Sequence, residues 1–154
     1  MSSIEKKPIT ALSRTRRTLP MALLRARETV MDRFRPMLHR HGVTEQQWRV
    51  LRVLDEADSI DASELAEGAA ILAPSLSRIL KTLETRGFIE LRKDPGDGRR
   101  SLISLTRAGS AFLAEVAPES AEIYKEIEGL IGAQRIETLL DEIDTLIVSL
   151  SEKR

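Results

Sequence analysis

The sequence contains no cysteine and only two histidines, His39 and His41. Without cysteine the chain has no disulfide, no thiolate nucleophile and no cysteine-ligated zinc, and two histidines cannot by themselves build a histidine-rich metal site. No apolar run approaches the ~20 residues of a membrane-spanning helix. The N-terminal segment MSSIEKKPITALSRTRR lacks the apolar stretch of a signal peptide. These absences predict a cytoplasmic protein with no bound metal, no cofactor and no membrane partner.

The chain also lacks a net charge, but its charged side chains are unevenly distributed. Residues 1–54 carry 12 basic and 4 acidic side chains, and residues 55–72 carry 6 acidic and no basic ones. Residues 73–107 carry 8 basic and 4 acidic side chains, and residues 108–154 carry 4 and 10. A protein that is neutral as a whole can therefore present a basic face. Its length of 154 residues suits a single domain, and no repeat or long linker divides it.

Apolar residues recur at helical spacing in the first third of the chain. This pattern predicts a long first helix, with Pro36 as a kink and Gly42 at its end. The arginines of this helix are expected to be solvated or paired with acidic residues rather than to contact nucleic acid. Thr44 followed by Gln47 has the spacing of a capping box, which predicts that a second helix begins there.

Two further helices are predicted before residue 90. Asp61 and Glu64 repeat the capping spacing at the start of a short helix that is expected to end near Gly68. Another helix begins at Pro74 and ends before Gly87. Its apolar stripe consists of Leu76, Ile79, Leu80 and Leu83, and its other face carries Ser75, Ser77, Arg78, Lys81, Thr82 and Thr85.

Two short alternating runs, FIELR and SLISLT, are joined by KDPGDGRR and predict a β-hairpin. The loop is not a phosphate-binding loop, because the string G-x-x-x-x-G-K-[ST] does not occur in the chain. It is not a calcium loop either, since the twelfth position counted from Asp94 is Leu105 and not a carboxylate. A solvated turn is one interpretation that stays open. In the other, Asp97 orients Arg99 and Arg100 adds a second cation at the tip, which suits the negative potential of a narrow minor groove.

Helices near both ends of the chain carry more apolar surface than one compact domain covers. Thr106 is predicted to cap the helix after the hairpin, and Pro118 to bend or interrupt it. The last helix has a broad apolar face made of Ile136, Leu139, Leu140, Ile143, Leu146, Ile147 and Leu150. Such faces predict a homodimer built from the two ends of the chain.

The order of helix, short helix, amphipathic helix and hairpin is typical of a winged helix-turn-helix. The predicted fold class is therefore mainly α with a small β-hairpin wing, flanked by N- and C-terminal dimerisation helices. The side chains predicted to contact double-stranded DNA are Ser75, Ser77, Arg78, Lys81, Thr82, Asp97, Arg99 and Arg100. A winged-helix module that binds protein and not DNA is the alternative. No nucleophile with its base and no metal-ligand spacing indicates catalysis, so no enzyme activity is predicted.

Between ELAEGAAILAPSLSRILKTLETRG and LTRAG the chain resembles the MarR family of bacterial transcriptional regulators. The segment DPGDGR resembles the family's D-x-R-x-x-R wing signature. Gly96 stands where many members carry arginine, and Arg100 is expected to replace that cation. The resemblance covers nearly the whole chain, and the segment from LPMALLRARETV to RVLRVL further resembles the regulators of homoprotocatechuate (4-hydroxyphenylacetate) degradation operons.

This resemblance implies one domain, 1–154, with a DNA-binding lobe at 44–106 and dimerisation helices at 10–42 and 107–152. It implies a homodimeric repressor on a palindromic operator, released by a small aromatic carboxylate that binds between the lobe and the dimerisation helices. A carboxylate needs a cation and a ring needs an apolar wall, so the candidate effector-binding residues are Arg14, Arg17, His39, Trp48 and Arg49. Two of them have other interpretations: Trp48 as a core residue that packs on Val43, and His39 as an exposed residue at a helix end.

Overall fold

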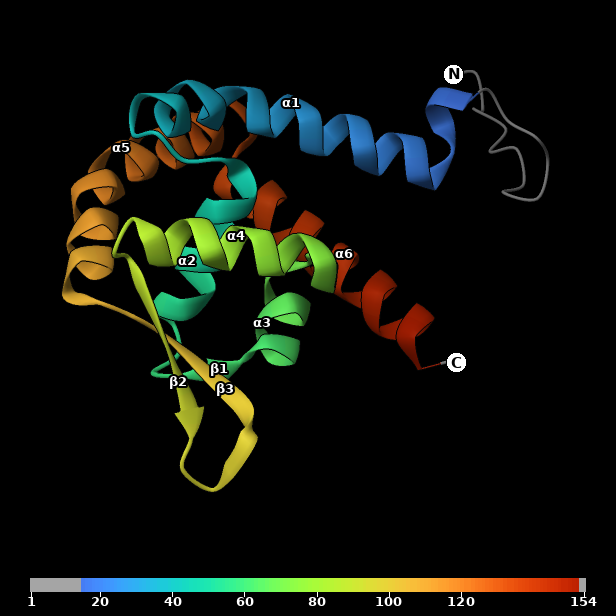
Figure 1. The fold of residues 1–154 in the computed structure, drawn as a ribbon. Helices are drawn as coiled ribbons and strands as arrows, with labels where there is room; N and C mark the ends of the chain where they lie inside the picture. Colours follow the sequence, from blue (N-terminus) through green and yellow to red (C-terminus); the bar gives the residue numbers. More distant parts are fainter. Residues whose placement is uncertain (1–14, 153–154) are drawn as a thin grey trace, which may run out of the picture.

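The computed structural model describes residues 15–152. Its elements are η1 (Thr15–Arg17), α1 (Leu19–Arg40), α2 (Glu45–Asp55), β1 (Ile60–Asp61), α3 (Ala62–Ala69), α4 (Ala73–Thr85), β2 (Ile89–Asp94), β3 (Asp97–Leu105), α5 (Arg107–Ile131) and α6 (Ala133–Ser151). In Figure 1, α4 lies across the centre of the molecule, the β2–β3 hairpin projects below it, and α1 and α6 extend to one side. The predicted fold class, a mainly helical winged helix-turn-helix with a small wing, is confirmed.

The hairpin belongs to a three-stranded antiparallel sheet with the strand order β1-β3-β2. Ile89 of β2 lies opposite Leu105 of β3, and Ile60 of β1 lies opposite Ile103. Strand β1 has only two residues, too few for an alternating pattern, and the sequence therefore did not predict it. This short strand ties the loop before α3 to the base of the wing.

Two buried apolar clusters hold the elements together. The larger one fills the lobe and consists of Val50, Leu51, Leu54, Leu65, Ala69, Ile71, Leu76, Ile79, Leu80, Leu83, Ile89, Ile103 and Leu113. The smaller one lies where α1 meets α5 and consists of Phe34, Met37, Leu38, Val43 and Val116. Trp48 and Phe112 pack against both clusters, so these two rings join the lobe to the terminal helices.

Several local signals at helix ends are confirmed. Thr44 and Gln47 form the predicted capping box of α2. At the start of α3, Asp61 Oδ1 accepts a hydrogen bond of 2.8 Å from the backbone N–H of Glu64. Gly87, just past α4, has a φ of +78°, the left-handed conformation that glycine adopts without strain. Each of these signals is carried by residues a few positions apart.

Helix α3 ends near Gly68, as predicted, but the left-handed residue at its end is not this glycine. Helix α3 runs through Gly68 to Ala69, and Ala70 is the left-handed residue that follows, with a φ of 54°. Gly68 allows α3 to approach α2 closely, since a Cβ there would lie 3.2 Å from Cγ1 of Val53. Pro118 does not interrupt α5. It is exposed, so the carbonyl that lacks a helical partner can face water.

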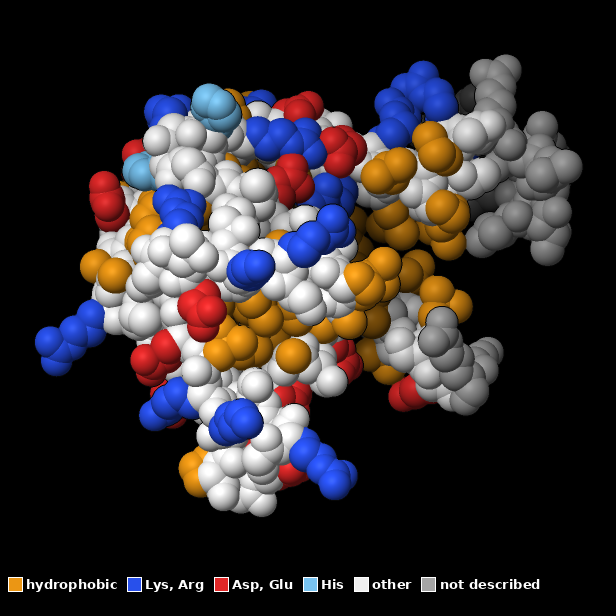
Figure 2. All heavy atoms as spheres, viewed as in Figure 1, with side chains coloured by type: hydrophobic (Ala, Val, Ile, Leu, Met, Phe, Trp, Pro, Cys, Tyr) orange, Lys and Arg blue, Asp and Glu red, His pale blue; other side chains and the backbone are white. Residues whose placement is uncertain are grey.

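The terminal helices α1, α5 and α6 expose large apolar side chains. These are Leu19, Leu23, Leu24, Val30, Tyr124, Leu130, Ile131, Leu139, Leu140, Ile147, Val148 and Leu150. No residue of α6 is buried. Figure 2 shows apolar surface gathered on the side where α1 and α6 extend from the lobe. Burying apolar surface away from water stabilises a protein by about 25 cal/mol of free energy per Å². A homodimer formed through these helices is therefore favoured.

Arg100 anchors the wing to the start of α3. Its Nε lies 2.9 Å from Asp61 Oδ2 and its Nη2 lies 2.9 Å from Glu64 Oε1, while Asp94 Oδ2 lies 3.9 Å from its Nη1. A hydrogen bond from the backbone N–H of Glu64, together with the charge of Arg100, lowers the pKa of Asp61 in spite of its partial desolvation. Asp61 therefore caps α3 and holds the wing with the same carboxylate.

We predict that Asp61→Asn makes the stability of the protein less sensitive to acid. Because the pKa of Asp61 is lowered in the folded state, its contribution to stability is complete above the unfolded value of about 3.9 and is lost as pH falls through the folded value. Asparagine caps a helix as well as aspartate does but carries no charge. The free energy of unfolding, measured with urea from about pH 6 to about pH 3, should fall more in the wild type than in the variant. A difference that stays constant would contradict this prediction.

Two glycines of α5 provide a matched test of packing. A Cβ on Gly109 would lie 2.2 Å from the carbonyl oxygen of Phe88, whereas a Cβ on Gly129 meets nothing within 4 Å. We predict that Gly109→Ala destabilises the fold by about 1–3 kcal/mol, because the junction between the sheet and α5 must shift. Gly129→Ala should stabilise it by up to about 1 kcal/mol through helix propensity. Urea unfolding measures both, and effects of the same sign would argue against the tight junction.

Candidate DNA-binding surface and ligand pocket

Helix α4 buries one side in the lobe and presents the other to solvent. A proline in its first turn starts the helix, and the predicted apolar stripe is buried. Ser77, Arg78, Lys81 and Thr82 are exposed, and Ser75 is half-buried. The helix therefore displays the predicted contact residues on the side away from the core.

The hydroxyl groups on this face donate to the helix's own backbone. Ser77 Oγ donates to the carbonyl of Ala73 at 3.3 Å, and Thr82 Oγ1 donates to the carbonyl of Arg78 at 3.2 Å. Their oxygen lone pairs stay available as acceptors. In these rotamers the hydroxyls suit the amino groups of adenine or cytosine in a major groove better than they suit phosphate oxygens.

The basic side chains of α4 and the wing differ from those of α1 in their partners. Five of them are exposed and form no ion pair with any residue in 15–152: Arg78, Lys81, Arg92, Lys93 and Arg99. Arg27, Arg35 and Arg40 of α1 are paired with carboxylates, as predicted for that helix. Figure 2 shows basic side chains over α4 and around the hairpin. Exposed cations without a counter-charge can bind the phosphate groups of a nucleic-acid backbone.

Two predictions for the wing differ from the structure. Asp97 Oδ1 accepts a hydrogen bond of 3.0 Å from the backbone N–H of Arg99, so it shapes the turn and does not orient the guanidinium. Arg100 is not a second cation at the tip, because Asp61 and Glu64 hold its guanidinium against α3. The wing's further cations are Arg92 and Lys93 of β2, just before the turn, which were not among the predicted contact residues. Their position beside the DPGD turn was the available signal.

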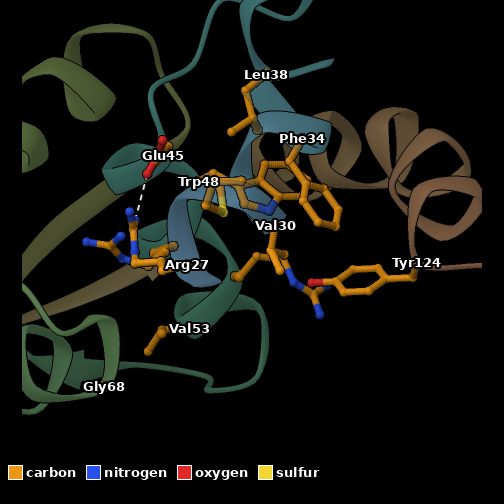
Figure 3. Close-up of a pocket in the computed structure, with 12 residues that line it drawn as sticks. Arg27, Val30, Phe34, Leu38, Glu45, Trp48, Val53, Gly68 and Tyr124 are labelled. Atoms are coloured by element: carbon orange, nitrogen blue, oxygen red, sulfur yellow. Dashed lines mark hydrogen bonds and ion pairs between the residues drawn. The ribbon is translucent and has the colours of Figure 1, made fainter. Parts of the chain in front are cut away.

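A cavity of about 360 Å³ lies between α1, α2 and α5. Its lining residues are Arg27, Val30, Met31, Phe34, Leu38, Glu45, Trp48, Arg49, Arg52, Val53, Gly68 and Tyr124. In Figure 3, Tyr124 extends from α5 on the side opposite to Arg27. The cavity lies between the lobe and the terminal helices, the region where the resemblance implies a ligand cleft.

The structure brings two of the five candidate effector-binding residues together. Trp48 and Arg49 line the cavity from α2. His39 is exposed in the last turn of α1, and Arg17 is exposed in η1, so neither lines it. Arg14 lies outside the described residues. For His39 the structure matches the interpretation as an exposed residue at a helix end, and for Trp48 it combines a core position with a wall of the cavity.

Other aromatic and basic groups also line the cavity, although the sequence pattern did not indicate them, including Arg27, Arg52, Phe34 and Tyr124. The ring centroids of Phe34 and Tyr124 lie 4.8 Å apart, which joins α1 to α5. Tyr124 is the only tyrosine in the chain and is 59% exposed. A single aromatic residue directly after Ile123, on a stretch of the helix that is rich in glutamate, was the signal that could have identified it.

An ion cluster beside the cavity connects α1 to the start of α2. Arg27 Nη2 lies 2.6 Å from Glu45 Oε2, and Arg35 Nε pairs with the other oxygen of Glu45. Glu28 and Asp32 of α1 also pair with Arg35, at 2.7 and 2.6 Å. Burial raises the pKa of Glu45, but the hydrogen bonds from Arg27 and Arg35 together lower it by more than burial raises it. The net shift is downward and favours the ionised carboxylate. Hydrogen bonds to Glu45 and Glu28 raise the pKa of Arg35.

Arg49 is a half-buried cation with no carboxylate partner among residues 15–152. Its Nε donates to the carbonyl of Ala69 at 2.9 Å. Burial, and then the nearby charge of Arg27, lower the pKa of Arg49. Arg52, the third arginine of the cavity, has carboxylates of its own helix no closer than 3.9 Å. Aromatic walls beside a cation that lacks a counter-charge suit an aromatic carboxylate.

Residues 15–152 contain neither a metal-ligand cluster nor a membrane-spanning helix. No group of three or more histidine, aspartate or glutamate side chains in this range is arranged to hold a metal ion. No helix in the same range is long and apolar enough to cross a membrane.

Residues 41–100 match the model of the MarR family. Among curated relatives, the homoprotocatechuate degradative operon repressor of Escherichia coli is 40% identical over 130 residues, which make up 84% of this chain and 88% of that protein. This match agrees with the subfamily resemblance of the first part of the sequence.

Two solved structures have the same fold. One is NadR in complex with 4-hydroxyphenylacetate, 35% identical with a TM-score of 0.77, covering 88% of this chain and 96% of that one. The other is the repressor CouR bound to a 23-mer DNA duplex, 28% identical with a TM-score of 0.79, covering 90% of this chain and 99% of that one. On the identity that extends over most of its length, the chain belongs to the MarR family.

Proposed function

We propose that this protein is a homodimeric repressor that binds double-stranded operator DNA and releases it when a small aromatic carboxylate binds. The observation that carries the proposal is the set of five exposed basic side chains on α4 and the wing that have no ion-pair partner among residues 15–152. Membership of the MarR family supports it, as does the structure of CouR on a DNA duplex. Such a repressor acts on DNA in the cytoplasm and performs no catalysis.

The shapes of α4 and the hairpin suit neighbouring parts of a duplex. A helix about 10–12 Å wide fits the major groove, where Arg78 can bond to a guanine edge and Lys81 to a phosphate. The hairpin then carries Arg99 along the backbone toward the adjacent minor groove. In a two-fold dimer the two α4 helices enter grooves about one helical turn, ~34 Å, apart, so the operator is expected to be palindromic.

The cavity is the proposed effector site. Its aromatic side chains can hold a phenyl ring, and Arg49 can bind a carboxylate. NadR was solved with 4-hydroxyphenylacetate, and the relative from Escherichia coli represses a homoprotocatechuate degradative operon. We infer that the effector is a phenolic acid of this class and that the regulated operon degrades aromatic acids.

A ligand lowers DNA affinity only if it binds one arrangement of the protein better than another. The cavity has walls from α1 and α5, which are terminal helices, and from α2, which belongs to the lobe. Its shape therefore depends on how the lobe sits against the terminal helices. A ligand that fits one position of the lobe relative to the terminal helices stabilises that position, and thereby shifts the spacing of the two α4 helices in the dimer.

We predict that Arg78→Ala and Arg99→Ala each weaken binding to the protein's own promoter DNA by roughly 1–3 kcal/mol. Both side chains are exposed, so the fold and the dimer should be preserved. Fluorescence anisotropy across a salt series should show a steep loss of wild-type affinity with salt. For a variant that loses one phosphate contact, the slope of log affinity against log salt should be shallower by about one.

Arg40→Ala is the matched control, because Arg40 lies on α1 and its guanidinium is paired with Glu119 at 2.8 Å. It removes the same charge and should leave DNA binding unchanged. If Arg78→Ala and Arg99→Ala together also left promoter binding unchanged, the alternative of a winged-helix module that binds protein would be favoured.

We predict that 4-hydroxyphenylacetate changes the fluorescence of Trp48, the only tryptophan in the chain, and releases the promoter DNA. Arg49→Gln should weaken binding of the acid about 10- to 100-fold, because a charge-assisted hydrogen bond contributes about 1.5–3 kcal/mol. His39→Gln should have no effect, since His39 lies outside the cavity. An equal loss in both variants, or no response of Trp48 to any phenolic acid, would contradict this assignment.

A further inference from the structure

Glu45 takes part in both the cavity and the ion cluster. It is the first residue of α2, so the DNA-binding lobe carries it, whereas its two arginine partners belong to α1. Its side chain is 22% exposed, and the solvent therefore screens its ion pairs only in part. Figure 3 shows the pair of Glu45 and Arg27 at the edge of the cavity.

Arg27 is the arginine of the cluster that lines the cavity, and Arg35 is not among the lining residues. The shortest ion-pair contact of Arg27 is the 2.6 Å contact with Glu45, and the other is a 3.1 Å contact with Glu28, its neighbour on α1. Glu28 does not line the cavity either. An acidic ligand that enters the cavity thus meets an arginine to which a carboxylate of the chain is already bound.

We propose that Glu45 is an internal competitor of the effector: the carboxylate of the bound aromatic acid contacts Arg49 and also takes the place of Glu45 on Arg27, and Glu45 keeps only Arg35. This inference rests on the effector site proposed above and adds how that site recognises a charge. The exchange moves no proton and breaks no covalent bond. One ionised carboxylate replaces another, in agreement with the lowered pKa of Glu45.

The exchange makes the site selective for acids. A neutral analogue, such as the amide of the same acid, cannot displace a carboxylate from an arginine because it forms only neutral hydrogen bonds. The exchange also limits affinity, because the acid must replace a charge-assisted hydrogen bond before it gains its own. The cavity therefore responds to higher concentrations of acid than it would if Arg27, like Arg49, had no carboxylate partner.

The exchange also removes a connection between the two parts of the protein. The contact between Arg27 and Glu45 joins residues 18 positions apart, on α1 and at the first turn of α2. With the acid on Arg27, this cluster ties α2 to α1 only through Arg35. The acid therefore binds with different affinity to two positions of the lobe relative to α1. This difference in affinity is what allows the acid to release DNA.

The test measures binding of 4-hydroxyphenylacetate and of its amide to the full-length protein by Trp48 fluorescence. The variants are Glu45→Gln, Arg27→Gln and the double variant. Asp32→Asn is the matched control, because Asp32 belongs to the same cluster and pairs with Arg35 at 2.6 Å but lines no part of the cavity. Promoter binding is measured for each variant with and without the acid.

Glu45→Gln should bind the acid about tenfold tighter and the amide as the wild type does, because glutamine is a weaker competitor for Arg27. In the Arg27→Gln background the same change should have little effect. Asp32→Asn should behave as the wild type. In Glu45→Gln the acid should bind more tightly yet shift promoter affinity less, whereas a purely structural role of Glu45 would weaken both properties.

Equal affinity of the acid for the wild type and Glu45→Gln overturns the proposal, and so does a gain that persists in the Arg27→Gln background, which would indicate general charge repulsion. In both cases a response of Trp48 in the wild type leaves the effector site intact. A response in Glu45→Gln alone supports the competition, and a response in neither protein overturns the inference and the effector site together. If Glu45→Gln does not fold, Arg27→Gln alone decides: unchanged affinity for the acid overturns the proposal.

Discussion

The arrangement of the chain depends on the packing of two rings, Trp48 and Phe112, against both apolar clusters. Arg86, the residue after α4, reinforces this joint. It donates to the carbonyl of Gly42 at 2.7 Å and lies 4.7 Å over the ring of Phe88, which stacks on Phe112 at 4.7 Å. The contacts run from the end of α4 to the turn between α1 and α2. Close-packed rings have few alternative arrangements, so a shift of α1 against α5 is passed to α4 and not absorbed locally.

The cavity shares a wall with this joint, because Trp48 belongs to both. A ligand that contacts Trp48 acts on a side chain that already sets the position of the lobe, so no separate route of communication is required. The charges of the cavity also lie at this contact between the lobe and the terminal helices. Three arginines and one glutamate line the cavity. The cavity therefore favours an anion even though Glu45 already pairs with one of these arginines, Arg27. The placement of these groups at the joint, more than the size of the cavity, makes it suited to regulation.

The features that the sequence predicted correctly are encoded over a few residues of chain. The capping box at Thr44, the proline at the start of α4 and the hairpin turn are local, and their order defines the fold. Interactions between distant segments were not predictable in this way. Arg100 follows a turn, and its neighbours suggest an exposed tip, but Glu64, one of the two carboxylates that hold it, lies 36 positions earlier. Tyr124 reaches the cavity only because α5 passes α1 at Phe34, which no periodicity indicates.

Pairing, more than composition, decides where this neutral chain can attract a polyanion. The N-terminal 54 residues hold 12 of the 24 basic side chains, yet Arg27, Arg35 and Arg40 are neutralised by nearby carboxylates. A paired arginine must give up its partner before it binds phosphate, whereas an unpaired one releases only counterions. The acidic stretch 55–72, which repels phosphate, serves the same end, because two of its carboxylates hold Arg100 and with it the base of the wing. The wing is thus fixed by a neutralised arginine, and the neighbouring Arg99 is left exposed, with no ion-pair partner among residues 15–152.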